Sequence, residues 1–85
     1  MKKFTRQEIE SKVNEILVDK LGIDASEIRN DAQMEADLNA DSLDAVELVM
    51  EFENEFYITI KDEDMDAMTQ WNVGNIYDLI EQLTA

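Results

Sequence analysis

Apolar residues recur at the spacing of an α-helix in three long segments of this 85-residue chain, and this pattern constrains the fold more than any other feature. Residues 5–21 form the first segment, which ends at Gly22, a residue type that commonly terminates helices. Residues 73–83 form the last, and Asn72 can cap it. The apolar positions of these two segments are Ile9, Val13, Ile16, Leu17 and Leu21, and Val73, Ile76, Tyr77, Ile80 and Leu83.

The middle segment predicts a second helix with two apolar stripes. It begins at Asp41 or Ser42, either of which can cap free backbone N–H groups, and runs through Phe56. The wider stripe, which suits a core, is Ala45, Leu48, Val49, Phe52 and Phe56. The narrower stripe is Leu43, Val46 and Met50, about 125° away at 100° per residue. Either a partner binds this second stripe, or the first helix or the long loop covers it.

The segments between these helices are shorter or less regular. Residues 22–41 predict an ordered loop whose apolar side chains tuck under the helices: Ile23, Ile28, Met34 and Leu38. Residues 57–60 alternate like a strand but have no partner run, so we expect no sheet. Asp62 can cap a short helix over residues 63–68. The sequence therefore predicts an all-α fold: one domain over residues 1–85, a small four-helix bundle of three longer helices and one short helix, with a long loop between the first and second helices.

The chain is strongly acidic, with a net charge of −14. Residues 1–30 hold six of the seven basic groups and six acids, whereas residues 31–85 hold fifteen acids and only Lys61. The negative electrostatic field of such a chain repels nucleic acid and anionic membranes and attracts proteins with basic patches. A solvated surface that the acids keep soluble accounts for the same excess of acids. No stretch is apolar enough to act as a signal core or to cross a bilayer, so we expect a soluble protein. We also expect it to be a monomer.

No residue pattern indicates an active site. The chain has no histidine and no cysteine, so Ser42 lacks the base that a nucleophilic serine requires. Residues 62–66 supply carboxylates at the first, third and fifth positions of a calcium loop, but Ala67 and Val73 stand where glycine and glutamate are needed. We expect no specific metal site, and Ser42 is a better attachment point than catalyst.

Residues 37–50, Asp-Leu-Asn-Ala-Asp-Ser-Leu-Asp-Ala-Val-Glu-Leu-Val-Met, resemble the attachment-site segment of acyl carrier proteins, and the likeness extends over nearly the whole chain. Asp44 and Glu47 are closer to the pattern of discrete fatty-acid carriers than to that of carriers in peptide synthetases. The resemblance implies that Ser42 receives 4′-phosphopantetheine from coenzyme A through a phosphopantetheinyl transferase, and that the arm carries acyl groups as thioesters in the cytoplasm. The sulfur then belongs to the cofactor, and the protein itself is no enzyme.

The resemblance also implies two sets of binding residues. Enzymes of fatty-acid synthesis with basic docking patches would contact the second helix, and acyl chains would lie between the helices. The partner-binding residues are Asp41, Leu43, Asp44, Val46, Glu47, Met50 and Glu53. The residues near the acyl chain are Leu48, Val49, Phe52, Met65, Met68 and Ile76.

The chain departs from the family pattern in three places. Asn39 stands where the family usually has glycine, and Lys61 stands where it usually has proline. Trp71-Asn72 stands where a threonine often caps the last helix. Asn39 can still adopt a left-handed conformation, and we expect Trp71 to pack against the last helix. Two alternatives remain open: a carrier for a specialised polyketide or other acyl pathway, and an acidic interaction module that carries nothing.

Overall fold

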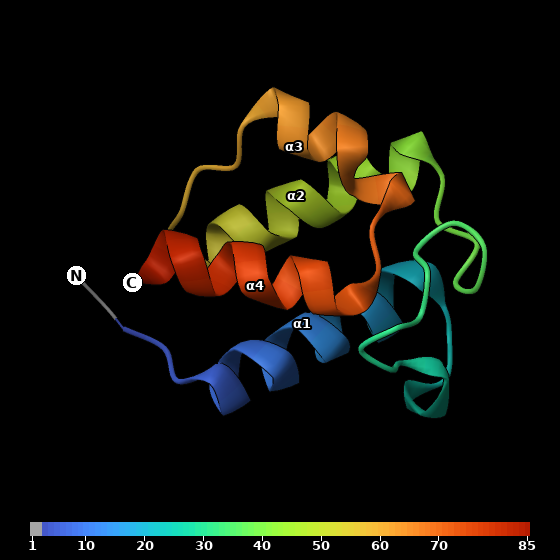
Figure 1. Ribbon diagram of the computed structural model, residues 1–85, viewed down its shortest axis with the longest axis horizontal. Helices are drawn as coiled ribbons and strands as arrows, with labels where there is room; N and C mark the ends of the chain where they lie inside the picture. The colour runs from blue at the N-terminus through green and yellow to red at the C-terminus, as the bar shows by residue number, and fades with distance from the viewer. Residues whose placement is uncertain (1–2) are drawn as a thin grey trace.

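The computed structural model describes residues 3–85 as a bundle of helices (Figure 1). Within these residues there is no strand, and one isolated antiparallel bridge joins Gln33 to Asn72. The predicted all-α four-helix bundle is confirmed. The elements are α1 (Arg6–Leu21), η1 (Ala25–Glu27), α2 (Ser42–Phe56), α3 (Asp62–Ala67), η2 (Met68–Gln70) and α4 (Val73–Thr84).

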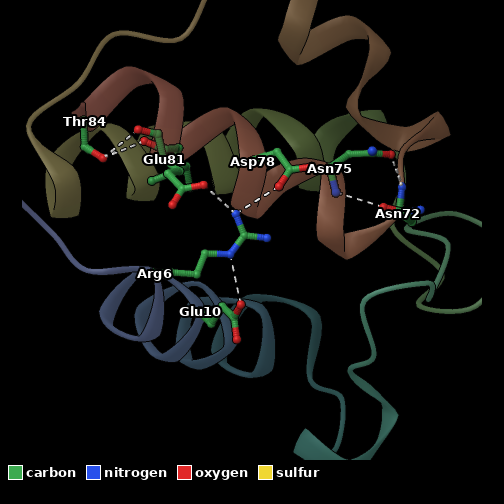
Figure 2. A network of polar contacts seen from close by, with 8 residues as sticks. Arg6, Glu10, Asn72, Asn75, Asp78, Glu81 and Thr84 are labelled. Carbon is green, nitrogen blue, oxygen red and sulfur yellow. Dashed lines mark hydrogen bonds and ion pairs between the residues drawn. The ribbon is translucent and has the colours of Figure 1, made fainter.

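Side chains fix the ends of the long helices. Thr5 Oγ1 accepts a hydrogen bond from Glu8 N at 3.1 Å, and Glu8 Oε1 accepts one from Thr5 N at 2.9 Å. Gly22 ends α1 with φ of 65°, a conformation that favours glycine, and its N–H donates to Val18 O. Asn72 and Asn75 make the equivalent reciprocal pair at the start of α4 (Figure 2). These three predicted helix ends are confirmed.

The predicted cap of the short helix is wrong. Asp62 is the first residue of α3, and Lys61 occupies the capping position without a side-chain hydrogen bond. The three acids of the first turn, Asp62, Glu63 and Asp64, interact favourably with the positive end of the helix dipole, so the helix begins without a capping side chain. The α-helix ends at Ala67, one residue earlier than predicted, and continues as the single turn η2.

One apolar cluster joins all the long helices. The wider stripe of α2 is buried, as predicted, and faces the buried positions of α1 and α4. The fully buried large side chains are Ile9, Val13, Leu17, Met34, Leu48, Phe52, Phe56, Met68, Val73, Ile76 and Ile80. Their burial out of water supplies most of the free energy that holds the bundle together.

The long loop is attached to the start of α4 by backbone hydrogen bonds. Val73 N donates to Ala32 O at 3.0 Å, and Gly74 N donates to Asn30 O at 2.9 Å. A Cβ on Gly74 would lie only 3.1 Å from Asn30 O, so this close approach favours glycine despite its cost to the helix. Met34 and Leu38, which belong to this loop, have buried side chains. The predicted ordered loop is therefore confirmed, and it holds the segment before Ser42 against the bundle.

Basic residues of α1 bind acids of α2 and α4. Arg6 Nη1 contacts Asp78 Oδ1 at 2.9 Å and Glu81 Oε1 at 3.0 Å, while Arg6 Nε contacts Glu10 at 3.0 Å (Figure 2). The same guanidinium lies 5.5 Å from the centre of the Tyr77 ring. Two further ion pairs, Lys12–Glu55 at 3.2 Å and Lys20–Glu51 at 3.5 Å, join α1 to α2.

Candidate functional site

Ser42 is the first residue of α2, and the residues around it fix its position. Asp41 Oδ1 accepts a hydrogen bond from Asp44 N at 2.8 Å, and Asp44 Oδ2 accepts one from Asp41 N at 3.0 Å. Asn39 has a φ of 59°, the left-handed conformation that the sequence predicted it could adopt. The turn at Asn39 and the reciprocal pair of aspartates therefore hold Ser42 at the exposed start of the helix.

The Ser42 side chain is exposed, and its hydroxyl makes no hydrogen bond with any residue in the range 3–85. No side chain in that range is therefore placed to take its proton. A serine hydroxyl without a base is a weak nucleophile. The site can present this hydroxyl to another molecule but has no means of activating it.

An open groove of about 330 Å³ begins at Ser42 and extends between α2 and the segment formed by α3 and η2. Its lining residues are Ser42, Leu43, Val46, Met65, Asp66 and Thr69. The sequence had not assigned Asp66 or Thr69 to the site, because nothing in the local pattern shows which face of so short an element lies toward α2.

The second apolar stripe of α2 is exposed to solvent. Relative exposure is 68% for Leu43, 38% for Val46 and 58% for Met50. Neither the first helix nor the long loop covers these side chains, so the structure excludes the alternative that these elements bury the stripe. An exposed apolar stripe beside Ser42 is available to a binding partner.

The acids predicted to surround this stripe have different environments. Asp41 and Asp44 cap α2, and each uses one carboxylate oxygen to do so. Glu47 is exposed and forms no ion pair within residues 3–85. Glu53 is half-buried, and its Oε2 accepts a hydrogen bond from Ile60 N at 2.8 Å. Glu53 therefore secures the link after α2, a role that sequence spacing did not indicate.

Comparison with known proteins identifies the family. The family model described as "Phosphopantetheine attachment site" matches residues 11–80. The chain belongs to the acyl carrier protein family. It is 45% identical over 78 residues to an acyl carrier protein of Thermotoga maritima, covering 92% of this chain and 94% of that one. A similar protein of Chloroherpeton thalassium is 42% identical over 80 residues, with 94% of each covered.

The fold supports the same assignment. A solved structure of the acyl carrier protein from Enterococcus faecalis matches with a TM-score of 0.78 and 35% identity, covering 94% of this chain and 99% of that one. The function and cofactor predicted from the sequence are thereby confirmed for the family: this chain is an acyl carrier of fatty-acid synthesis that uses 4′-phosphopantetheine. As an acyl carrier protein, it acts with enzymes that load and transfer acyl groups.

The residues predicted near the acyl chain of this carrier lie in one part of the bundle. Five of them are at most 5% exposed: Leu48, Val49, Phe52, Met68 and Ile76. Met65 is half-buried, packs on the same cluster and also lines the groove beside Ser42. Met65 therefore connects the groove to the buried interior.

Two of the positions that depart from the family pattern can be located in the carrier. Trp71 is half-buried and packs against the core, as expected, beside Asn75 and Leu79 of α4. Lys61 is exposed and forms no ion pair within residues 3–85.

No group of three or more acids within residues 3–85 could hold a metal ion, and residues 62–66 lie in the helix α3 rather than in a loop. Among the same residues, no helix has the length and hydrophobicity needed to cross a membrane.

Proposed function

We propose that Ser42 is the residue to which 4′-phosphopantetheine is attached. The observation that carries this proposal is the placement of Ser42: exposed, without a hydrogen-bond partner in residues 3–85, and held at the first position of α2 beside an open groove. In the attachment reaction, Ser42 Oγ forms a bond to the diphosphate phosphorus of coenzyme A that bears the pantetheine arm. The P–O bond between the two phosphates breaks, and adenosine 3′,5′-bisphosphate leaves. A separate transferase must accept the hydroxyl proton, because no side chain within residues 3–85 is hydrogen-bonded to that hydroxyl to take it.

The phosphodiester would stay in solvent rather than bind tightly to the helix. A helix N-terminus attracts anions through its free N–H groups. Here the Asp41 carboxylate already accepts from Asp44 N, and two negative side chains flank the attachment point. We therefore expect a mobile arm that can reach into a partner enzyme.

The proposed docking surface is the stripe of Leu43, Val46 and Met50 with the acids Asp41, Asp44 and Glu47. Its apolar centre and charged border match the usual anatomy of a protein interface, and its charge favours partners with a basic patch. We leave Glu53 out, because its carboxylate is engaged by Ile60 N. The partners proposed are a phosphopantetheinyl transferase and enzymes of fatty-acid synthesis.

Acyl chains would enter the core from the groove at Met65, between α2 and α3. The residues beyond Met65 are closely packed, so α3 and α2 must separate for a chain to enter. A chain bound there should stabilise the folded state, because it binds the native protein and not the unfolded one. We include a cytoplasmic location and a single carrier domain over residues 1–85 in this proposal.

The intact mass of the protein after incubation with coenzyme A and a broad-specificity transferase tests the proposal. We expect one adduct on the natural chain and on Ser26→Ala, a matched change at another exposed serine, and none on Ser42→Ala. An adduct that persists in a folded Ser42→Ala protein would refute the assignment. Absence of acyl turnover by the purified carrier alone would support its role as a carrier rather than an enzyme.

A further inference from the structure

A second open groove, of about 400 Å³, lies between α3 and α4. It shares no residue with the groove beside Ser42. Its lining residues are Asp64, Trp71, Asn75, Asp78, Leu79 and Gln82. Trp71 and Leu79 are half-buried and pack against the core, so they provide an apolar surface, while the other four residues are polar.

The two carboxylates of this groove are available to a ligand. Asp64 is half-buried and makes no side-chain hydrogen bond or ion pair within residues 3–85. Asp78 uses one oxygen, Oδ1, to bind Arg6 (Figure 2), and its side chain remains 68% exposed. Among the residues that the structure describes, no basic residue lines the groove, and residues 62–85 carry six acids with no lysine or arginine. Asp64 therefore has no compensating cation within residues 3–85, whereas Arg6 compensates part of the charge of Asp78, so the groove keeps a net negative charge.

An indole beside two carboxylates suits a guanidinium group. The planar cation can stack on the aromatic face and donate hydrogen bonds to a carboxylate in the same plane, whereas a lysine ammonium can do only part of this. We propose that the groove of Asp64, Trp71 and Asp78 binds an arginine side chain from a basic segment of a partner protein. This surface extends the proposed function: it would hold the partner at a site separate from Ser42.

Trp71 gives a direct measurement, because it is the only tryptophan in the chain. The full-length protein is titrated with a short capped glycine–serine peptide that carries a pair of arginines, and Trp71 fluorescence is followed. Matched peptides carry two lysines or two citrullines. We expect the arginine peptide to change the fluorescence saturably and to bind about fivefold more tightly than the lysine peptide, with no response to citrulline.

Two variants separate specific binding from general attraction to an acidic protein. Asp64→Asn removes a carboxylate of the groove that makes no side-chain hydrogen bond or ion pair within residues 3–85, and Glu63→Gln makes the same charge change one residue away, outside the groove. Both acids lie in the first turn of α3, so the two variants lose a similar interaction with the helix dipole. Asp64→Asn should weaken the arginine peptide about fivefold, whereas Glu63→Gln should change its affinity by less than about twofold. Both variants should still be modified at Ser42, so a failure here is distinguishable from a failure of the carrier proposal.

Three results would overturn the proposal. One is equal binding of the arginine and lysine peptides with equal weakening by the two variants, which would indicate attraction by net charge. Another is the absence of any change in Trp71 fluorescence. The third is a Trp71 fluorescence that changes with protein concentration in the absence of peptide, together with a dimer in sedimentation. That result would place a second copy of the chain in the groove.

Discussion

Replacing Arg6 with glutamine removes the side chain that joins the start of α1 to α4. Arg6 contacts Glu10, Asp78 and Glu81 at 2.9–3.0 Å and lies against the Tyr77 ring. The hydrogen bond to Glu10, followed by that to Asp78, raises the pKa of Arg6 above its usual range, so the group stays charged throughout the experiment. The Arg6→Gln protein keeps three acids together without their common cation.

The size of the effect follows from the geometry. A half-exposed ion pair contributes about 0.2–1 kcal/mol, and a cation over an aromatic ring about 0.5–1 kcal/mol at an exposed site. Because one guanidinium serves three carboxylates and one ring, we expect Arg6→Gln to lower the free energy of unfolding by about 2 kcal/mol. For a domain of this length that corresponds to a fall in Tm of about 8–16 °C.

Lys61→Gln is the matched control, since Lys61 forms no ion pair within residues 3–85 and the change alters net charge equally. Urea unfolding of both variants, followed by Trp71 fluorescence and circular dichroism, gives the two free energies. Arg6→Gln should cost much more than Lys61→Gln, and the difference should shrink at high salt. Equal losses would show that general self-repulsion, and not this network, accounts for the effect of Arg6.

Four further outcomes follow from the same structure. Sodium chloride should raise the thermal midpoint, because a net charge of −14 repels itself, and an unchanged midpoint would contradict this. Tyr57 has a φ of 57°, which favours glycine, and its side chain is 75% exposed. Tyr57→Gly should therefore raise the free energy of unfolding, measured with urea, by about 0.5–1 kcal/mol, whereas Tyr57→Ala should not raise it. Asp41→Ala should cost about 1 kcal/mol through loss of the α2 cap, measured against Glu35→Ala, since Glu35 is an exposed acid with no side-chain hydrogen bond or ion pair within residues 3–85. Burial raises the pKa of Tyr77. The stability that the neutral phenol contributes is therefore present below about pH 10 and is lost as the pH rises through the pKa of the folded state. The urea midpoint of the natural protein should fall between about pH 9 and 11, and Tyr77→Phe should make that fall smaller.

The parts of the fold that were predictable depend on contacts between neighbours in sequence. Helical spacing and reciprocal caps act within three or four residues, so the ends of α1, α2 and α4 followed from the sequence. The start of α3 did not follow from the sequence. An acid in the first turn stabilises a helix through its dipole, and an acid at the cap stabilises it by accepting hydrogen bonds from backbone N–H groups. The sequence does not show which of these two roles Asp62 has.

Contacts between distant residues were not predictable. The loop is held by hydrogen bonds from Val73 and Gly74 to carbonyl groups some forty residues earlier, and no periodicity indicates such a pairing. The resemblance to acyl carrier proteins assigned Glu53 to the docking surface together with other acids of the second helix. Its actual partner, Ile60 N, comes into reach only because the chain reverses after Phe56. The exposure of Leu43, Val46 and Met50 likewise required knowledge of where α1 and the loop lie.

The uneven distribution of charge along the chain has a structural consequence that bears on docking. Basic residues of α1 bind Glu51 and Glu55 in the second half of α2, and Ile60 N binds Glu53 there. Glu47, in the first half, has no ion pair within residues 3–85, and Asp41 and Asp44 have none either. The basic residues of α1 therefore pair with two acids at the end of α2 far from Ser42, whereas the end that begins at Ser42 keeps its negative charge. A partner with a basic patch would be drawn to that end, because uncompensated charge steers encounter and paired charge does so weakly.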